Sequence, residues 1–348
     1  MLYLAFVSSI FRKSSLEELR KIMKFKIVGE FNNFLVIDSR SKNAHVKTAG
    51  LALVYFVLPL YVNGSVSKDA YRESILRLLC DAAVDKGGNM KLECINLNSK
   101  TVYSAKDLEV WEGRRLEKLG YAIDMEKEPV TLVYFALLDM KCYVGHMKVA
   151  DMPRPFVNPF RHYHTQRLVS RSELKIEQAF DEFAIDGVSG VAIDLGAAPG
   201  GWSCYLARRG YDVIAVDNGK LDAKAIRECG VKIKTAKGGR IGTGDLVRGI
   251  LHVKERSAQA AGRLKVRGVS LLADDMNIDC SSTYKALSRY SQFLDSGGLA
   301  IVTIKCITKY LPGHARKARK LFSAGFRIRR MRVLPANRQE FTLFIEKK

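Results

Sequence analysis

The hydrophobic pattern of the second half of the chain predicts strands that alternate with helices. Short apolar runs of strand length alternate with segments in which apolar residues recur at every third or fourth position, as along one helix face. Such an alternation is typical of a doubly wound α/β domain, whose mainly parallel sheet carries helices on both faces. We expect this domain over residues 173–348. Its expected strands are 191–195, 212–216, 268–273, 299–304, 327–333 and 340–346, and its expected helices are 173–183, 202–209, 282–294 and 314–324.

The first half of the chain has the pattern of two smaller α/β units. A turn at Asn63-Gly64 follows the longest apolar run, 49–62, and separates a predicted domain over 1–64 from a second over 65–150. The first unit is predicted to contain an N-terminal strand, a helix over 16–23 and strands over 26–31 and 34–37. The second is predicted to contain helices over 68–85 and 104–119 and strands over 91–97, 130–138 and 142–149.

The charge of the chain indicates a polyanionic partner. With 57 lysines and arginines against 36 aspartates and glutamates, the 348 residues carry a formal charge of +21, and the pI is near 9.7. Cations bind phosphates and release counterions, so nucleic acid is the leading candidate. A generally cationic surface without a specific ligand is the alternative. Positive side chains gather in 154–171, in 240–267 and near the C-terminus, where a helix would place Arg316, Lys317 and Lys320 partly on one side.

A linker over 151–172 precedes the C-terminal domain. Its prolines interrupt regular structure, and arginine, histidine and aromatic side chains alternate between them. Such a segment can hold phosphates and stack bases, or it can be a connector strapped onto the next domain by its aromatic side chains. Both interpretations stay open. The candidate RNA-binding arginines of the linker are Arg154, Arg161, Arg167 and Arg171.

The remaining composition excludes several classes of protein. Seven cysteines without C-x-x-C pairs form neither a disulfide framework nor a zinc site, and a reducing compartment is expected. The apolar run 49–62 contains Pro59 and is too short for a membrane span. The apolar segment 1–11 lacks a basic leader and a cleavage site. We therefore expect a soluble, cytoplasmic protein without a membrane partner.

A glycine-rich loop follows the first strand of the C-terminal domain. The strand ends at Asp194-Leu195, and Gly196-Ala197-Ala198-Pro199-Gly200-Gly201-Trp202 then leads into a helix, so backbone can approach a ligand closely there. Roughly twenty residues on, the second strand ends at Asp217, where a carboxylate can accept hydrogen bonds from a cofactor ribose. A dinucleotide fingerprint would read GxGxxG. The charge of Asp194 would oppose a pyrophosphate but suits the ammonium group of S-adenosylmethionine.

Two further strands also end in charged residues, which would therefore face the same edge of the sheet. Asp275 follows the strand LLAD, and Lys305 follows AIVTI. Lys175 precedes the first strand, and Glu340 begins the last. Taken singly, each has a structural explanation, such as a surface lysine or a strand-end cap. Their joint order on one alternating scaffold favours a catalytic set.

The segment DLGAAPGGWS and the order of these four residues resemble the FtsJ-type ribose methyltransferases. The resemblance implies a Rossmann-like doubly wound S-adenosylmethionine methyltransferase domain with a catalytic tetrad of Lys175, Asp275, Lys305 and Glu340. SRSELKIEQAF, IAVDNG and NRQEFT are similar to the RlmM-type branch, which methylates large-subunit rRNA. KGGNMKLECINLNSK and VTLVYFALLDMKCYVGHMKV resemble more loosely a THUMP domain, an RNA-binding module. The implied cofactor contacts are Asp194, Gly196, Ala198, Pro199, Gly200, Gly201, Trp202, Asp217 and Asp275.

The chemistry of ribose methylation accounts for the tetrad. A ribose hydroxyl is a weak acid, so the transfer needs a base near the attacking oxygen and in-line placement of the methyl group. We expect Lys305 to be that base, with a pKa lowered by burial or by a second cation. Lys175 would supply the neighbouring positive charge. Asp275 would orient Lys305, and Glu340 would position Lys175 or the ribose. No metal is needed.

Other functions stay open. Methylation of an exocyclic amine is disfavoured, because the strand end reads ADDMN and the nearest Asn-Pro-aromatic motif, Asn158-Pro159-Phe160, lies in the linker. Methylation of cytosine carbon-5 would need a cysteine nucleophile, for which Cys306 is the candidate. A third alternative is a non-catalytic RNA-binding assembly factor. The sequence does not choose between tRNA and large-subunit rRNA, and it leaves a homodimer open.

One region departs from the family pattern. Residues 217–267 show little periodicity and are expected to be less regular. Asp245 is the candidate for an acidic residue near the adenine. The basic segment 251–268 is expected to be a surface helix, either facing RNA or simply solvated.

Overall fold

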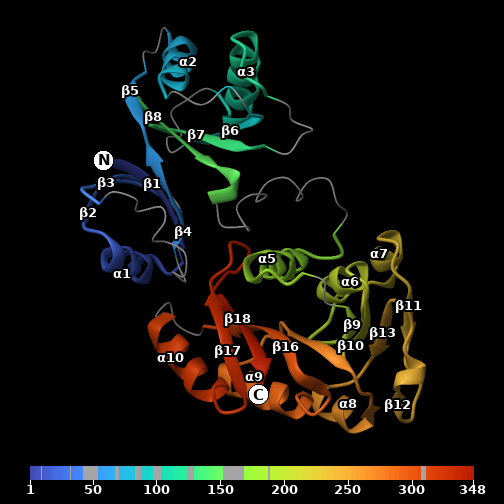
Figure 1. Ribbon diagram of the computed structural model, residues 1–348. Helices are drawn as coiled ribbons and strands as arrows, with labels where there is room; N and C mark the ends of the chain where they lie inside the picture. Colours follow the sequence, from blue (N-terminus) through green and yellow to red (C-terminus); the bar gives the residue numbers. More distant parts are fainter. Residues whose placement is uncertain are drawn as a thin grey trace. The chain divides into compact units, whose positions relative to one another are not determined.

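The computed structural model describes residues 1–8, 10–31, 33–41, 54–66, 70–82, 86, 88–96, 103–123, 129–151, 168–186, 189–306 and 311–348. The chain divides into two compact units, Met1–Val157 and Asn158–Lys348 (Figure 1). Each helix in the described part of the chain is too short or too polar to span a lipid bilayer.

The first sheet of the N-terminal unit has the order β2-β3-β1-β4 and is antiparallel. Alternating side chains of its strands pack on helix α1, and Tyr3, Leu19 and Val57 are among the side chains of this core that are closed to solvent. Its elements are β1 (Leu2–Val7), α1 (Arg12–Ile22), β2 (Phe25–Phe31), β3 (Phe34–Ser39) and β4 (Val54–Leu60).

The second sheet of this unit has the order β5-β8-β7-β6, in which β6 and β7 are parallel and the other pairs antiparallel. Its core includes Ile75 of α2, Leu108 of α3 and Phe135 of β7. The apolar run 49–62 therefore contributes to both sheets, since β5 belongs to this one. The elements are β5 (Val62–Ser65), α2 (Tyr71–Asp81), β6 (Met90–Asn96), α3 (Ala105–Lys118), β7 (Thr131–Leu138), β8 (Lys141–Lys148) and the short 3-10 helix η2 (Val149–Asp151).

The C-terminal unit is built on an eight-stranded sheet of order β11-β13-β10-β9-β15-β16-β18-β17. The strands from β11 to β16 are parallel, and β18 runs antiparallel between β16 and β17. The predicted doubly wound α/β arrangement is thus confirmed. The strands are β9 (Gly190–Leu195), β10 (Tyr211–Val216), β11 (Ile233–Thr235), β13 (Ile250–Val253), β15 (Val269–Asp274), β16 (Leu294–Lys305), β17 (Phe326–Arg332) and β18 (Glu340–Lys347).

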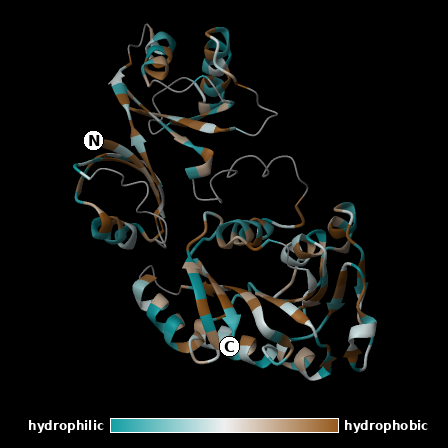
Figure 2. Cartoon of the chain, in the orientation of Figure 1, coloured by the Kyte–Doolittle hydropathy of each residue, from teal (hydrophilic) through white to brown (hydrophobic). Residues whose placement is uncertain are grey.

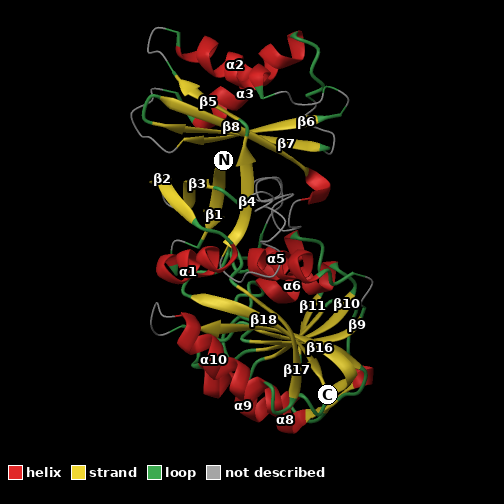
Figure 3. Ribbon diagram, turned by 60° about the vertical axis from the view of Figure 1, so that its left-hand side comes forward, coloured by secondary structure: helices red, strands yellow, loops and turns green. Residues whose placement is uncertain are grey.

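Helices cover both faces of this sheet (Figure 3). Helices α5 and α6 lie on one face, where Ile176 and Leu206 pack with Ala192 and Val213 in the main core. Helices α8, α9 and α10 lie on the other face, and hydrophilic positions mark the outer side of α10 (Figure 2). The helices are α5 (Glu173–Phe183), α6 (Gly201–Arg208), α7 (Ala223–Glu228), α8 (Ser257–Arg263), α9 (Cys280–Tyr290) and α10 (Leu311–Phe322).

The region 217–267 is more regular than its sequence pattern predicts. It contains α7, β11, the short strand β12 (Ile241–Gly242), the 3-10 helix η3 (Thr243–Asp245), β13, α8 and the short strand β14 (Leu264–Lys265), which pairs with β12. The expectation of one surface helix over 251–268 is wrong, because β13 ends at Val253 and α8 begins only at Ser257. Strand β13 was missed because ILHV is a four-residue run with no alternation, although all four side chains are buried.

A buried ion pair anchors α5 in this unit. The Glu173 side chain is closed to solvent, pairs with Arg208 of α6, and accepts a hydrogen bond from the backbone N–H of Val169 (3.2 Å). Because a buried charge without its partner is costly, we predict that Glu173→Ala lowers the free energy of unfolding of the C-terminal unit by about 3 kcal/mol. Urea unfolding in a Trp111→Phe background, where Trp202 alone reports, measures it.

Arg327→Ala is the matched control for this prediction. The Arg327 side chain is 65% exposed and lies 3.8 Å from Glu346, which keeps its contact with Arg329 in the variant. Surface pairs contribute about 0.5 kcal/mol, so this variant should unfold almost as the parent does. A Glu173→Ala effect as small as the control would contradict the anchoring role.

Candidate functional site

The sheet brings the four predicted catalytic residues together at its carboxyl edge. Strand β15 leads directly into Asp275, and β16 ends at Lys305. Because β18 is antiparallel to β16, its first residue, Glu340, lies directly opposite Lys305 in the register. Lys175 reaches the same place from the first turn of α5. Two parallel strands, β15 and β16, end at this edge of the sheet, and the antiparallel strand β18 begins there. This arrangement brings the charged residues at the three strand ends together.

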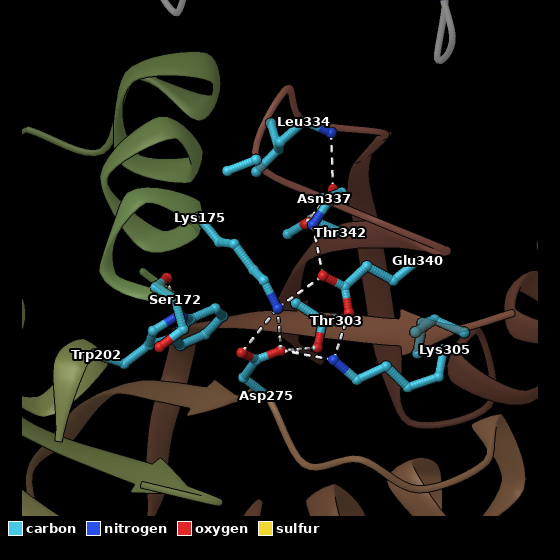
Figure 4. A network of polar contacts seen from close by, with 12 residues as sticks. Ser172, Lys175, Trp202, Asp275, Thr303, Lys305, Leu334, Asn337, Glu340 and Thr342 are labelled. Carbon is cyan, nitrogen blue, oxygen red and sulfur yellow. Dashed lines mark hydrogen bonds and ion pairs between the residues drawn. The ribbon is translucent and has the colours of Figure 1, made fainter. Parts of the chain in front are cut away.

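The four side chains form a closed ring of contacts in which each lysine touches both acids (Figure 4). Lys175 Nζ lies 3.1 and 3.0 Å from the two Asp275 carboxylate oxygens and 2.7 Å from Glu340 Oε1. Lys305 Nζ donates to Asp275 Oδ1 at 2.8 Å and to Glu340 Oε2. The four side chains are 6–20% exposed, so the ring is largely shielded from solvent.

The charge environment of Lys305 differs from the expectation. Burial alone would lower its pKa, but the charges of Asp275 and Glu340 outweigh burial, and the pKa of Lys305 is raised above the ordinary lysine value. The prediction of a lowered pKa is therefore wrong for the protein alone. Burial likewise opposes ionisation of Glu340, but Lys175 and Lys305 together lower the pKa of this carboxyl.

Two neutral side chains that the sequence did not single out contact the acids of the ring. Thr303 Oγ1 donates to Asp275 Oδ1 at 2.6 Å. Asn337 Oδ1 accepts from the backbone N–H of Leu334 (2.7 Å) and from Thr342 Oγ1 (3.2 Å), which turns Asn337 Nδ2 toward Glu340 Oε1 (3.4 Å). A threonine two residues before a strand-end lysine shares its side of the strand, and this spacing was a usable signal.

The glycine-rich loop lies beside the ring and is closely packed. Gly196 has a φ of +76°, and a Cβ there would lie 3.0 Å from the backbone nitrogen of Met276. A Cβ on Gly201 would lie 2.3 Å from Ser170 Oγ, so the segment before α5 also approaches this loop. Asp217 accepts from the backbone N–H groups of Ala198 (3.0 Å) and Gly219 (2.6 Å). These contacts hold the ends of β9, β10 and β15 as one cradle.

Several of the predicted loop residues pack against neighbouring parts of the domain. Trp202 is 3% exposed, and its indole N–H donates to the carbonyl of Ser172 (2.8 Å). Its side chain therefore belongs to the core and fixes the segment before α5. Gly200, with a φ of +116°, packs on Ile226 of α7, and the carbonyl of Pro199 accepts from the N–H of Asp222 (2.8 Å).

Two buried aspartates lie beneath the cradle. Asp194 accepts from Ser203 Oγ (2.5 Å), and Asp274 accepts from the N–H of Met276 (2.9 Å). Among the described residues, nothing hydrogen bonds to Asp194 Oδ1 or to Asp274 Oδ2. Burial raises the pKa of Asp194 to about 7 and that of Asp274 to about 8. The edge therefore holds two acids that favour a proton or a cation.

Strand β13 supplies another neighbour of the cradle. His252 is 5% exposed, and its Nε2 lies 3.2 Å from the carbonyl oxygen of Asp217. The sequence did not place His252 there because β13 was not predicted. Asp245, the expected adenine contact, is exposed and accepts from the N–H of Gly242 (2.8 Å) in η3.

The candidate RNA-binding residues are only partly described. Arg154, Arg161 and Arg167 lie outside the described residues. Arg171 is exposed just before α5, and Arg316, Lys317 and Lys320 are exposed on α10. In the part of the chain that the structure describes, no cluster of three or more His, Cys, Asp or Glu could hold a metal ion.

Comparison with known proteins identifies the unit that carries the ring. The family model of the FtsJ-like methyltransferases matches residues 168–327. This part of the chain is an FtsJ-like methyltransferase domain. The resemblance seen in the sequence is thereby confirmed, and the sheet around the ring is the α/β fold of a methyltransferase.

Two relatives that match this part of the chain carry the same name. The chain is 29% identical over 215 residues to the ribosomal RNA large subunit methyltransferase M of Shewanella frigidimarina, covering 58% of this chain and 59% of that protein. It is 35% identical over 149 residues to the protein of the same name from Erwinia tasmaniensis, covering 40% of each. The matches thus span about half the length of these relatives.

Solved structures with some similarity include TrmN from Thermus thermophilus, with 13% identity, a TM-score of 0.40 and full coverage of both chains. A second is the fibrillarin/Nop5p complex, with 16% identity and a TM-score of 0.35, over 49% of this chain and 81% of that one.

The buried acids of the FtsJ-like domain predict a pH dependence of stability. An unfolded aspartate has a pKa of about 3.9, so the folded protein retains a proton on Asp274 that the unfolded chain loses as pH rises toward 8. This difference destabilises the fold progressively between about pH 4 and 8. Asp274→Asn keeps an acceptor for the Met276 N–H and removes the titration. Relative to the parent, its free energy of unfolding should rise by about 2 kcal/mol or more between pH 5 and 9.

Urea unfolding at both pH values measures this change. Asp279→Asn is the control, because hydrogen bonds from Ser282 and Ser281 lower the pKa of Asp279, and its titration is complete below this range. A pH-independent difference between Asp274→Asn and the parent would show that Asp274 ionises normally.

Proposed function

We propose that the protein transfers a methyl group from S-adenosylmethionine to a ribose 2′-hydroxyl of a structured RNA. The observation that carries this proposal is the ring of Lys175, Asp275, Lys305 and Glu340 beside the glycine cradle. Two ammonium groups and two carboxylates at one strand edge form a preorganised site for moving a proton and for stabilising charge on an oxygen. The names of the relatives, which denote ribosomal RNA methyltransferases, are consistent with it.

The residues of the cradle fit S-adenosylmethionine. Its amino group is a cation, and Asp194, with one unpartnered oxygen and a pKa near 7, supplies negative charge beneath the loop. Gly196 and Gly200 have positive φ values and pack closely on Met276 and Ile226, so glycine at both positions fixes the turn whose backbone would approach the cofactor. Asp217 still has acceptor capacity for a ribose hydroxyl beyond its two backbone donors. When bound, the cofactor supplies a methyl group activated by the sulfonium charge.

Lys305 is the proposed base, and its raised pKa determines both the fraction of free amine and the strength of that amine as a base. As a free amine it is a minority form at neutral pH, but it is a strong base because Asp275 and Glu340 stabilise its conjugate acid. It loses a proton to solvent and then takes the proton of the 2′-hydroxyl. Lys175, held by the same two acids, keeps positive charge next to the oxygen that attacks.

RNA recognition is assigned to several parts of the chain. The exposed cations of α10, Arg316, Lys317 and Lys320, would contact phosphates, together with Arg171 and the linker arginines. The second sheet of the N-terminal unit, with α2 and α3, is proposed as the THUMP-like RNA-binding domain. Large-subunit rRNA is the favoured substrate because of the relatives' names, and tRNA is the alternative.

Methylation of cytosine carbon-5 through Cys306 is less well supported. Burial raises the pKa of this thiol to about 12, and the Cys306 side chain is 5% exposed. A thiol so rarely ionised is a poor nucleophile. Cys306→Ser should therefore keep full transfer activity. This result would exclude Cys306 as the nucleophile and agree with Lys305 as the base.

The catalytic assignment predicts a separation of chemistry from binding. Lys305→Ala and Asp275→Ala should each lower the single-turnover rate of methyl transfer to RNA at least about 100-fold, because the first removes the base and the second removes the carboxylate that orients it. The affinity for S-adenosylmethionine, measured by calorimetry, should change less than about threefold in Lys305→Ala. Arg329→Ala, a change on the edge strand β17, is the control.

Retained turnover in the Lys305→Ala variant would contradict the assignment of the base. Loss of cofactor affinity in parallel with turnover would indicate a collapsed site. If no RNA is methylated by the parent protein and calorimetry detects no cofactor, the non-catalytic assembly factor becomes the better description.

The cradle predicts which glycine the cofactor needs. Gly196→Ala adds a Cβ 3.0 Å from the backbone of Met276 and should weaken S-adenosylmethionine binding at least about tenfold. Gly210→Ala is matched, since Gly210 also has a positive φ (+93°) but has no atom within 4 Å of the added Cβ. It should lose about 1 kcal/mol of stability and keep its affinity. Equal affinities in the two variants would place the cofactor elsewhere.

A further inference from the structure

Thr303 is a buried hydroxyl directly beneath the ring. It lies on β16 two residues before Lys305, so the two side chains point to the same side of the strand. Thr303 is fully buried, and its hydroxyl donates to Asp275 Oδ1 at 2.6 Å (Figure 4). The carbonyl of Asp274, at 3.4 Å, is a much weaker second acceptor. The single proton of this hydroxyl is thus committed to Asp275.

The Asp275 oxygen that Thr303 contacts is also the one that holds Lys305. Oδ1 receives Thr303 at 2.6 Å, Lys305 at 2.8 Å and Lys175 at 3.1 Å, whereas Oδ2 receives only Lys175, at 3.0 Å, among the contacts within the ring. A carboxylate oxygen offers about two lone-pair directions. Three donors therefore compete for the lone pairs of Oδ1. Thr303, which lies at the shortest distance, weakens the attraction between this oxygen and the Lys305 ammonium.

The opposite acid has no comparable hydroxyl contact among the described residues. Glu340 meets both lysines and the amide of Asn337 at 3.4 Å, a long contact. Glu340 and Asp275 thus differ in how strongly a neutral donor competes with the lysines. The ion pair of Lys305 with Asp275 is therefore weakened by a competing donor, whereas its ion pair with Glu340 is not weakened to the same extent.

We propose that Thr303 is a positioning residue that fixes the Asp275 carboxylate and weakens its hold on the Lys305 ammonium. This inference rests on the proposed function of Lys305 as the base. Without the hydroxyl, the negative charge of Asp275 falls more fully on Lys305, and the ammonium form gains stability. The free amine then becomes rarer at every pH below the pKa of Lys305, and the transfer rate falls throughout this range.

The experiment is the pH dependence of the single-turnover transfer rate at saturating cofactor and RNA, in the full-length chain. In the parent, the rate should rise with pH as Lys305 loses its proton. Thr303→Val should be about tenfold slower near pH 7, with the rise displaced upward by about one pH unit, since a hydrogen bond to a charged group is of this size. Thr303→Ser keeps the hydroxyl and should restore the parent profile.

Thr283→Val is the matched control. Thr283 of α9 is also fully buried, but its hydroxyl donates to the backbone carbonyl of Asp279 (3.0 Å) rather than to a carboxylate of the ring. It loses an equally buried hydroxyl, so any cost in folding is comparable. Its pH profile should keep the position of the parent's rise.

The outcomes separate this inference from the proposed function. A Thr303→Val rate equal to that of the parent, a loss of rate that Thr303→Ser does not restore, or a rise shifted to lower pH would overturn the positioning role. If Lys305→Ala is inactive while Thr303→Val matches the parent, only the role of Thr303 fails. If Lys305→Ala is active, the proposed base fails, and the role of Thr303, which depends on that base, is overturned with it.

Discussion

Two lysines and two carboxylates can be buried together at the carboxyl edge of this sheet because each ammonium group lies between both acids. Removing a charge from water is costly, and the cost is offset only when partners and hydrogen bonds satisfy it. The ring meets this condition with no net charge. Loss of any member leaves an unpaired charge in a site that is at most 20% exposed. The same balance stabilises the protonated form of Lys305 and raises its pKa.

The fold provides this ring through register rather than through loops. Asp275 and Lys305 follow neighbouring parallel strands, and the antiparallel insertion of β18 places Glu340 opposite Lys305. The anchored helix α5 adds Lys175 from above the sheet. The glycine cradle is held to the same edge by Asp217 and by the contact of Gly196 with Met276. Strands and a helix, rather than loops, would therefore hold a methyl donor in the cradle close to a nucleophile at the ring.

Much of this architecture could be predicted from the sequence, because long periodic segments and strand-end charges are local signals. The strands on either side of the glycine-rich loop were predicted from their apolar periodicity. The four ring residues were predicted from their places beside strand ends and before the first strand. What failed depends on tertiary context. ILHV was too short to reveal β13, and with it His252. The pKa of Lys305 depends on two acids supplied by distant strands, and burial alone suggested the opposite direction. The burial of the Trp202 side chain in the core is likewise set by residues distant in the sequence.

The chemistry of the product tests the central claim most directly. The parent protein is incubated with RNA and S-adenosylmethionine carrying an isotopically labelled methyl group, and the RNA is digested to nucleosides for mass spectrometry. The account predicts the label on the ribose, in a 2′-O-methylnucleoside that also leaves an alkali-resistant linkage. Label on a nucleobase would contradict the role assigned to the lysine–carboxylate ring.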